Sequence, residues 1–178
     1  MNAEDGKWVF GYGSLMWRPG FAFIERRPAT LHGRRRAFCI YSVHHRGTYD
    51  RPGLVLGLAP GGSTRGAAYL VSPADWPGVY AYLREREQPT ETYFEGWRTI
   101  TLDDRRRDPA LVFLSDRNHP QWAGDLTLEA QADLIAGSTG LSGRNVDYLR
   151  DLVQHLAEED IHDHGLERLL KMVIAREG

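Results

Sequence analysis

One predicted helix in the middle of a strand-rich sequence limits the possible folds more than any other feature. Ser72 can cap this helix, because a serine oxygen accepts hydrogen bonds from the first backbone N–H groups, and Pro73 suits the first turn. Pro89 disfavours helical geometry at Gln88, so the helix should end at about residue 87. Strand-like segments lie on both sides of it, at 8–12, 30–42, 54–58, 66–71, 97–102 and 110–115.

The last part of the chain is expected to be helical, at 127–137, 145–158 and 165–176. Strands therefore come first, one helix interrupts them, and helices follow, without a regular strand–helix–strand alternation. This order predicts a mixed α/β (α+β) fold with a mostly antiparallel sheet, built as a single domain over residues 1–178. Pro60-Gly61-Gly62 is expected to form a turn between two strands, and Asn145 is expected to cap the helix that follows it.

Composition favours a globular domain and argues against a nucleic acid partner. The 178 residues, 42% of them hydrophobic and 26% charged, suit a globular domain with a substantial core. Lys and Arg number 22 against 24 Asp and Glu, and a net charge of -2 gives no electrostatic footprint for a nucleic acid partner. The arginine runs at 34–36 and 105–107 are short, so we expect a solvated strand edge or turn at each.

A single cysteine, Cys39, excludes an internal disulfide and lies in a strand-like run, where it should be buried. The polar start of the chain and the lack of a long apolar run predict a cytoplasmic protein without a membrane partner. His162 and His164 lie among acidic residues, but no second segment has the spacing of metal ligands, so no metal is expected.

Glu87 occupies an unusual place in the predicted helix. Trp76, Tyr80 and Leu83 form one apolar stripe, and the next step along it falls on Glu87, within about 40° of the stripe. Glu85 lies on the opposite, solvent side. Burial of an unpaired carboxylate is costly, since loss of water raises its pKa. Glu87 is therefore predicted to be either part of a buried ion pair or a general base with a pKa raised towards neutrality.

The segment WVFGYGSLMW, residues 8–17, joins a buried strand to a glycine-rich turn. Gly11 and Gly13 can take positive φ and let a ligand approach the backbone, and successive N–H groups in such a turn can hold an anion. Ser14 would add a hydroxyl group. From the two glycines alone, a β-bulge is the simpler explanation. A dinucleotide-binding loop is excluded, because Met16 stands where that motif requires a third glycine.

Five short motifs follow one another along the chain. They are VFGYGSL at 9–15 with Trp17; HRGT at 45–48 with RPGLVLGL at 51–58; GAAY at 66–69; RE at 86–87 with Thr90, Tyr93 and Trp97; and SGRN at 142–145 with DYL at 147–149. Together they cover most of residues 8–160 and resemble the ChaC family of γ-glutamylcyclotransferases, which act on glutathione. The resemblance implies a γ-glutamylcyclotransferase-like fold, a partial barrel of mostly antiparallel strands with flanking helices.

The resemblance also implies a reaction. The α-amine of the substrate attacks its own γ-carbonyl and closes a five-membered ring, which gives 5-oxoproline and, from glutathione, cysteinylglycine. Neither a protein nucleophile nor a metal or other cofactor is implied. The general base would be Glu87, which the helix pattern independently directs inward.

The turn is implied to grip the γ-glutamyl group through Val9, Phe10, Gly11, Tyr12, Gly13, Ser14 and Leu15. Tyr148 resembles a position that contacts substrate and Tyr93 lies in the catalytic block, although both could instead be core aromatic residues. Arg46 could meet the far carboxylate of glutathione or form a structural ion pair.

Three residues depart from the usual family pattern, namely His44, Gln88 and Glu91. They leave the substrate open between glutathione and another γ-glutamyl amine or peptide. A non-catalytic γ-glutamyl-binding module is the alternative from a different class of function.

Overall fold

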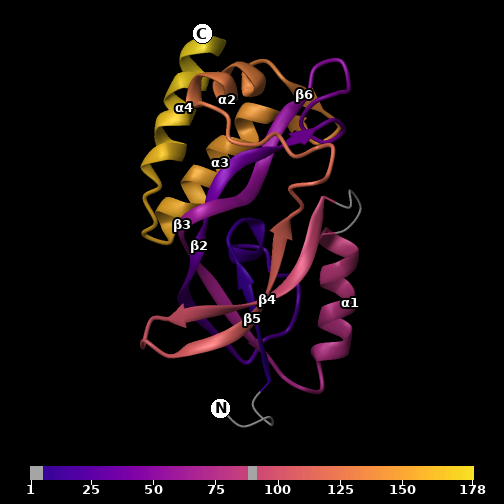
Figure 1. Ribbon diagram of the computed structural model, residues 1–178, viewed down its shortest axis with the longest axis vertical. Coiled ribbons are helices and arrows are strands. Elements are labelled where there is room, and N and C mark those ends of the chain that lie inside the picture. Colours follow the sequence, from indigo (N-terminus) through magenta and orange to yellow (C-terminus); the bar gives the residue numbers. More distant parts are fainter. Residues whose placement is uncertain (1–5, 88–91) are drawn as a thin grey trace. The chain divides into compact units, whose positions relative to one another are not determined.

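The computed structural model describes residues 6–87 and 92–178. Five strands form a closed barrel in the order β1-β3-β2-β4-β5. They are β1 (Lys7–Gly11), β2 (Glu25–Ser42), β3 (Gly53–Val71), β4 (Tyr93–Leu102) and β5 (Arg107–Ser115). Figure 1 labels β4 and β5, which pair with each other. The pairs β1–β3, β2–β4 and β4–β5 are antiparallel, whereas β1 and β5 pair in parallel and close the barrel. The expected mostly antiparallel sheet is confirmed.

Four α-helices agree with the predicted segments to within a few residues. They are α1 (Trp76–Glu87), α2 (Leu128–Ile135), α3 (Asn145–Glu158) and α4 (His164–Glu177). A short 3-10 helix, η1 (Ser14–Met16), follows β1, and β6 (Thr139–Gly140) pairs with β7 (Gly143–Arg144). Ser72 Oγ accepts a hydrogen bond from the N–H of Asp75 over 3.0 Å, as a residue that begins a helix does. Gln88 and Pro89, the predicted stop, lie outside the described residues.

Contacts divide the chain into two compact units. The first comprises Met1–Arg36 and Pro60–Asp116, and it includes β1, η1, α1, β4 and β5. The second comprises Ala37–Ala59 and Arg117–Gly178, with α2, α3, α4 and the β6–β7 pair. Strands β2 and β3 contribute residues to both units. A single domain over residues 1–178 stays a prediction.

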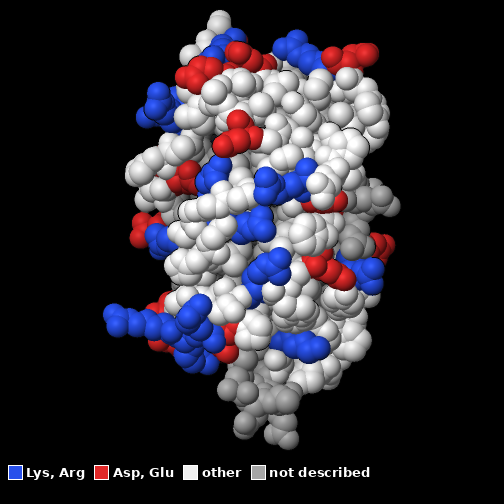
Figure 2. All heavy atoms as spheres, viewed as in Figure 1, with Lys and Arg blue, Asp and Glu red and all other residues white. Residues whose placement is uncertain are grey.

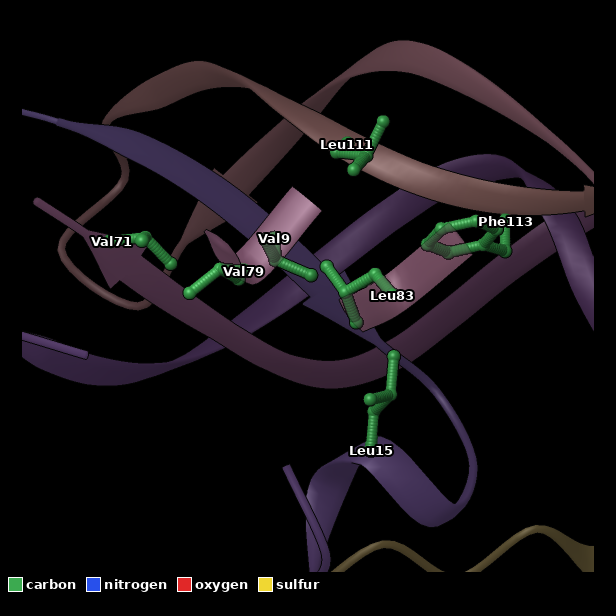
Figure 3. Close-up of a cluster of buried hydrophobic side chains, with 7 residues drawn as sticks. All are labelled: Val9, Leu15, Val71, Val79, Leu83, Leu111 and Phe113. Atoms are coloured by element: carbon green, nitrogen blue, oxygen red, sulfur yellow. The ribbon is translucent and has the colours of Figure 1, made fainter. Parts of the chain in front are cut away.

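The core of the first unit joins α1 to the barrel. Figure 3 shows the buried cluster, which consists of Val9, Leu15, Val71, Val79, Leu83, Leu111 and Phe113. Val79 and Leu83 come from α1 and the other members come from β1, η1, β3 and β5. Full burial of one such side chain stabilises the fold by about 1.5–3 kcal/mol. These contacts fix which side of α1 faces the barrel.

Asn145 begins α3, but it does not cap it. Its Oδ1 accepts a hydrogen bond from the N–H of Leu54, and its Nδ2 donates one to the Leu54 carbonyl, both over 2.8 Å. The N-cap position of α3 is Arg144 instead, without a side-chain cap. The predicted cap is therefore wrong. The Asn145 side chain is fully buried and satisfies both backbone groups of a residue on β3, which would otherwise lose water without a partner.

The turn predicted at Pro60-Gly61-Gly62 is also wrong, because β3 continues through it as one strand. Gly61 and Gly62 have φ values of 92° and 66°. Glycine adopts such positive values without steric cost, and inside a strand they are typical of a bulge that bends it without reversing its direction. The run 105–107 does lie in or beside the turn between β4 and β5, as expected.

The structure also shows where the cysteine and the charged side chains lie. Cys39 is buried, as predicted, and basic and acidic side chains are interspersed over the face seen in Figure 2. Within residues 6–87 and 92–178, no helix has the length and apolar character needed to cross a membrane.

Candidate active site

Glu87 is the last residue of α1 and lies one helical turn after Leu83, which packs in the cluster between α1 and the barrel. Leu83, one turn earlier, is fully buried, and the Glu87 side chain is 20% exposed. Glu85 is exposed. The inward direction predicted from the helical repeat is therefore confirmed.

Burial raises the pKa of the Glu87 carboxyl group, and the positive charge of Arg86 partly opposes this rise. The Nε of Arg86 lies 3.8 Å from Glu87 Oε1, which is too long for a hydrogen bond. Among the described residues, no donor forms a hydrogen bond with this carboxylate. An arginine is close, but its charge does not cancel the effect of burial on the pKa of Glu87. The role of Glu87 as a general base stays a prediction.

The glycine-rich turn is tight for a reason that differs from the predicted one. A Cβ on Gly11 would lie 2.9 Å from the Cβ of Leu15, so the backbone of β1 and the helix η1 approach too closely for any side chain at this position. Gly11 has no positive φ, and Gly13 has a φ of -136°. The expected left-handed glycines are therefore wrong. The chain reverses through the 3-10 helix that folds back onto Gly11.

Most side chains of the turn belong to the core. Val9 and Phe10 are fully buried and Leu15 is nearly so. The hydroxyl of Tyr12 donates a hydrogen bond of 2.7 Å to the buried carbonyl of Phe113 on β5. These side chains hold the turn in place, and Ser14 is its exposed residue.

Ser14 is exposed and lies beside the end of α1. Its Oγ accepts a hydrogen bond of 2.9 Å from Nη2 of Arg86, the same guanidinium group that approaches Glu87. The first backbone N–H groups of a helical turn have no acceptor within that turn. Those of Ser14 and Leu15 likewise find none in the part of the chain that the structure describes. A hydroxyl group, backbone donors and a carboxylate are thus gathered in one place.

Arg36 also holds this turn, although its sequence indicated a solvated residue. Its side chain reaches the carbonyl oxygens of Tyr12, over 2.7 Å, and of Arg65, and it is only 9% exposed. The expectation for the run 34–36 is therefore wrong at Arg36. No periodic pattern signals a contact between residues so far apart in sequence.

Tyr93 is the first residue of β4, where it pairs with Ser115, and it packs against the core cluster of the first unit. Thr90 and Glu91, from the same motif, lie outside the described residues, as does Gln88.

Tyr148 and Arg46 lie together in the second unit. The hydroxyl of Tyr148 accepts a hydrogen bond of 3.2 Å from the N–H of Leu56, and the guanidinium of Arg46 lies 5.4 Å from the centre of the Tyr148 ring. Arg46 also donates a hydrogen bond of 3.1 Å to the carbonyl of Arg144. These contacts are structural, and substrate contact by either residue stays a prediction.

Comparison with known proteins places the chain in a family. The model of the family described as ChaC-like protein matches residues 7–176. The chain belongs to the ChaC-like family. This ChaC-like chain is 40% identical over 170 residues to a glutathione-specific γ-glutamylcyclotransferase of Escherichia coli, covering 96% of the chain and 74% of that protein. It is 34% identical over 153 residues to glutathione-specific γ-glutamylcyclotransferase 1 of Homo sapiens, covering 84% of the chain and 69% of that protein.

The ChaC-like fold also matches a solved structure over nearly the whole chain. A crystal structure of a yeast γ-glutamyl cyclotransferase specific to glutathione superimposes with a TM-score of 0.85 at 28% identity, covering 97% of this chain and 100% of that one. The γ-glutamylcyclotransferase-like fold implied by the sequence motifs is therefore confirmed. Among the residues described for this ChaC-like chain, no group of three or more His, Cys, Asp or Glu side chains could hold a metal ion.

Proposed function

We infer that this ChaC-like chain is a γ-glutamylcyclotransferase that cleaves glutathione to 5-oxoproline and cysteinylglycine. The names of its E. coli and human relatives support the reaction and the substrate. One observation of the geometry carries the inference. A single guanidinium group, that of Arg86, contacts both the Ser14 hydroxyl of the turn and the Glu87 carboxylate, whose pKa is raised.

The reaction needs few groups from the protein. The α-amine of the γ-glutamyl group attacks the γ-carbonyl carbon, a new C–N bond closes the five-membered ring, and the original amide C–N bond breaks. The amine of cysteinylglycine leaves with a proton, and no water is consumed. Because the nucleophile belongs to the substrate, the protein has to hold the γ-glutamyl group bent, with its amine close to its carbonyl carbon. This proximity accelerates the reaction.

Glu87 is proposed as the group that moves the proton. Its carboxylate takes a proton from the substrate ammonium, so that the amine becomes nucleophilic. After the ring closes, the attacking nitrogen gives up a second proton, and the leaving amide nitrogen takes up both, so that cysteinylglycine leaves as an ammonium ion. A base works best when its pKa lies near the working pH, which burial favours here by raising the pKa of Glu87 above its usual range.

The turn is proposed to hold the γ-glutamyl group. The backbone N–H groups of Ser14 and Leu15 and the Ser14 hydroxyl would donate to the α-carboxylate and help to polarise the γ-carbonyl. Val9, Phe10 and Tyr12 would act through the backbone that their buried side chains fix.

The other predicted contacts complete the proposal. Tyr93 would line the site from β4, and substrate contact by Tyr148 and Arg46 stays a prediction. A cytoplasmic location and the absence of nucleic acid and membrane partners also stay predictions.

A panel of substrates tests the proposed function. The purified protein is incubated separately with reduced glutathione, γ-glutamylalanine and a γ-glutamyl amine at equal concentrations, and 5-oxoproline and the released amine are quantified by mass spectrometry. We expect equal amounts of 5-oxoproline and cysteinylglycine from glutathione, and much slower release from the other two compounds.

The other outcomes point to the alternatives. Faster release of 5-oxoproline from a different γ-glutamyl compound would mean that the same chemistry serves another substrate. Calorimetric binding of glutathione without any product would instead identify a γ-glutamyl-binding module.

A further inference from the structure

We propose that Arg86 is a positioning residue, whose guanidinium orients the Ser14 hydroxyl as a hydrogen-bond donor and fixes residues 14–20 against α1. The proposal rests on the proposed function, because it gives Ser14 a substrate to donate to. Arg86 itself would touch neither the attacking amine nor the carbonyl. It would act through the turn that holds them.

The contacts of Arg86 extend over the whole segment. Nη2 donates to Ser14 Oγ over 2.9 Å, and Nη1 donates to the carbonyl oxygens of Arg18 and Pro19 over 2.5 and 3.2 Å. Nη1 also donates to the hydroxyl of Tyr82, one turn earlier on α1, over 3.0 Å. Four acceptors around one rigid, planar group determine the position of that group. Through it, the last turn of α1 is joined to the segment that follows β1.

The direction of one hydrogen bond determines what Ser14 can do. An arginine has donors and no acceptor, so Ser14 Oγ must accept from Arg86. The hydroxyl proton of Ser14 is then directed elsewhere, and Arg86 is the only hydrogen-bond partner of this oxygen among the described residues. Ser14 is therefore held as a donor. The α-carboxylate of a γ-glutamyl substrate is an anion that only accepts hydrogen bonds, which matches this polarity.

The segment that follows η1 also packs closely against α1 at Tyr82. Gly20 has a φ of 74°, and a Cβ at this position would overlap the hydroxyl of Tyr82. The ring of Phe21 lies 6.4 Å from the ring of Tyr82 in an edge-to-face arrangement. The segment therefore meets α1 through Tyr82 as well as Arg86, at two successive turns of the helix.

Arg86 has two separate effects. Its positive charge acts on the pKa of Glu87, and the fork of donors on its guanidinium holds Ser14 and residues 18 and 19. Within the described residues, it is the only positively charged side chain found within 4 Å of the Glu87 carboxylate, and its charge opposes the rise of the Glu87 pKa. A lysine would keep the charge, but its compact ammonium group cannot donate to Ser14 and to the carbonyls of residues 18 and 19 in one fixed fork. The two effects should therefore respond differently to Arg86→Lys and Arg86→Met.

The test compares steady-state kinetics on glutathione for the parent, Arg86→Met, Arg86→Lys and the control Arg84→Met. Arg84 lies two residues earlier on α1, and its half-exposed side chain is 3.9 Å from Glu95 rather than near Ser14. The pH profile of kcat/KM is recorded for each variant. Ser14→Ala and the double variant Ser14→Ala/Arg86→Met complete a cycle that measures coupling between the two residues.

We expect Arg86→Met to raise KM about tenfold, since one charge-assisted hydrogen bond is worth roughly that factor, and to move the acidic limb of the profile to higher pH. Arg86→Lys should return the acidic limb towards that of the parent while KM stays high. The effects of the two changes on KM should be less than additive in the double variant, because part of the effect of Arg86 would pass through the Ser14 hydroxyl. Arg84→Met should behave like the parent. Equal KM values for Arg86→Met and Arg84→Met, or additive effects in the cycle, would overturn the proposal.

A second measurement separates this proposal from the proposed function. Amide hydrogen exchange of residues 12–19 requires no turnover, and it should become faster in Arg86→Met than in Arg84→Met while exchange in β4 and β5 stays unchanged. If the parent does not cleave glutathione, the proposed function fails, and unchanged exchange in this segment would independently remove the positioning role of Arg86. If the parent is active and exchange is unchanged, only the positioning role fails.

Discussion

Leu83 and Glu87 lie one helical turn apart on the same side of α1, and the packing of the first directs the second. Leu83 is fully buried in the cluster that joins α1 to the barrel, so α1 cannot rotate about its axis without exposing it. Glu87 is consequently held on the inner side of the helix, where burial raises its pKa. The packing of Leu83 thus contributes to the raised pKa of Glu87, on which the proposed chemistry depends.

The raised pKa of Glu87 predicts the pH dependence of activity. Because the carboxyl group must be deprotonated to act as a base, kcat/KM should fall as the pH drops through the pKa of Glu87. Burial places this pKa above that of an ordinary glutamate, so the acidic limb should lie above the usual range for a carboxyl group. A pH profile of kcat/KM on glutathione measures it, and a limb at the pH of an unperturbed glutamate would contradict the prediction.

The same shift predicts how stability depends on pH. The folded-state pKa of Glu87 lies above its unfolded-state value, so its contribution to stability is fully present below the unfolded pKa and is lost as the pH rises through the folded pKa. Glu87→Gln removes this loss. The free energy of unfolding of Glu87→Gln, relative to the parent, should therefore increase from acidic to neutral pH in urea titrations. A difference that is constant with pH would argue against a buried, ionising carboxyl group.

Tyr12→Phe should weaken the fold at the turn. The change removes the donor to the buried carbonyl of Phe113, which should cost about 1–3 kcal/mol in the free energy of unfolding. Urea denaturation measures the cost. Tyr49→Phe is the matched control, because Tyr49 is 76% exposed and its change should stay within about 0.5 kcal/mol. Equal stabilities of the two variants would show that the Tyr12 hydrogen bond does not anchor the turn.

Asn145→Ala should destabilise the protein, although Asn145 is the first residue of α3 and does not cap that helix. Both backbone groups of Leu54 would lose their partner, at about 1–3 kcal/mol for each buried group. The expected loss exceeds that of Gln154→Ala, an exposed position on the same helix. Thermal and urea unfolding of both variants would decide, and a loss no greater than that of Gln154→Ala would contradict the role assigned to this amide.

Glu87 could be predicted from sequence because its signal is local. A helical repeat of four residues relates it to Leu83, and that repeat survives in the structure as it appears in the sequence. The strand at 8–12 and the helices were predictable for the same reason. Each depends on the spacing of apolar residues along a single element.

Arg36 and Asn145 could not be assigned in this way, since their roles depend on partners far along the chain. Arg36 meets the carbonyls of Tyr12 and Arg65, and Asn145 meets Leu54. An arginine run typically indicates solvent and an asparagine before a helix typically indicates a cap, but tertiary contacts replaced both local preferences. The Pro60-Gly61-Gly62 stretch shows the same limit, because β3 runs through this local turn signal as one strand.

The most direct test of the account is the rate of 5-oxoproline formation from glutathione in Glu87→Gln, with Glu85→Gln beside it. The two variants carry the same substitution two residues apart on α1, one on the inner side and one exposed to solvent. General acid–base catalysis typically contributes a factor of about 10²–10⁴, so Glu87→Gln should be at least about a hundredfold slower than the parent while it melts at the same temperature or higher. Glu85→Gln should keep the rate of the parent. A folded Glu87→Gln protein with a near-normal rate would contradict the assignment of Glu87 as the base.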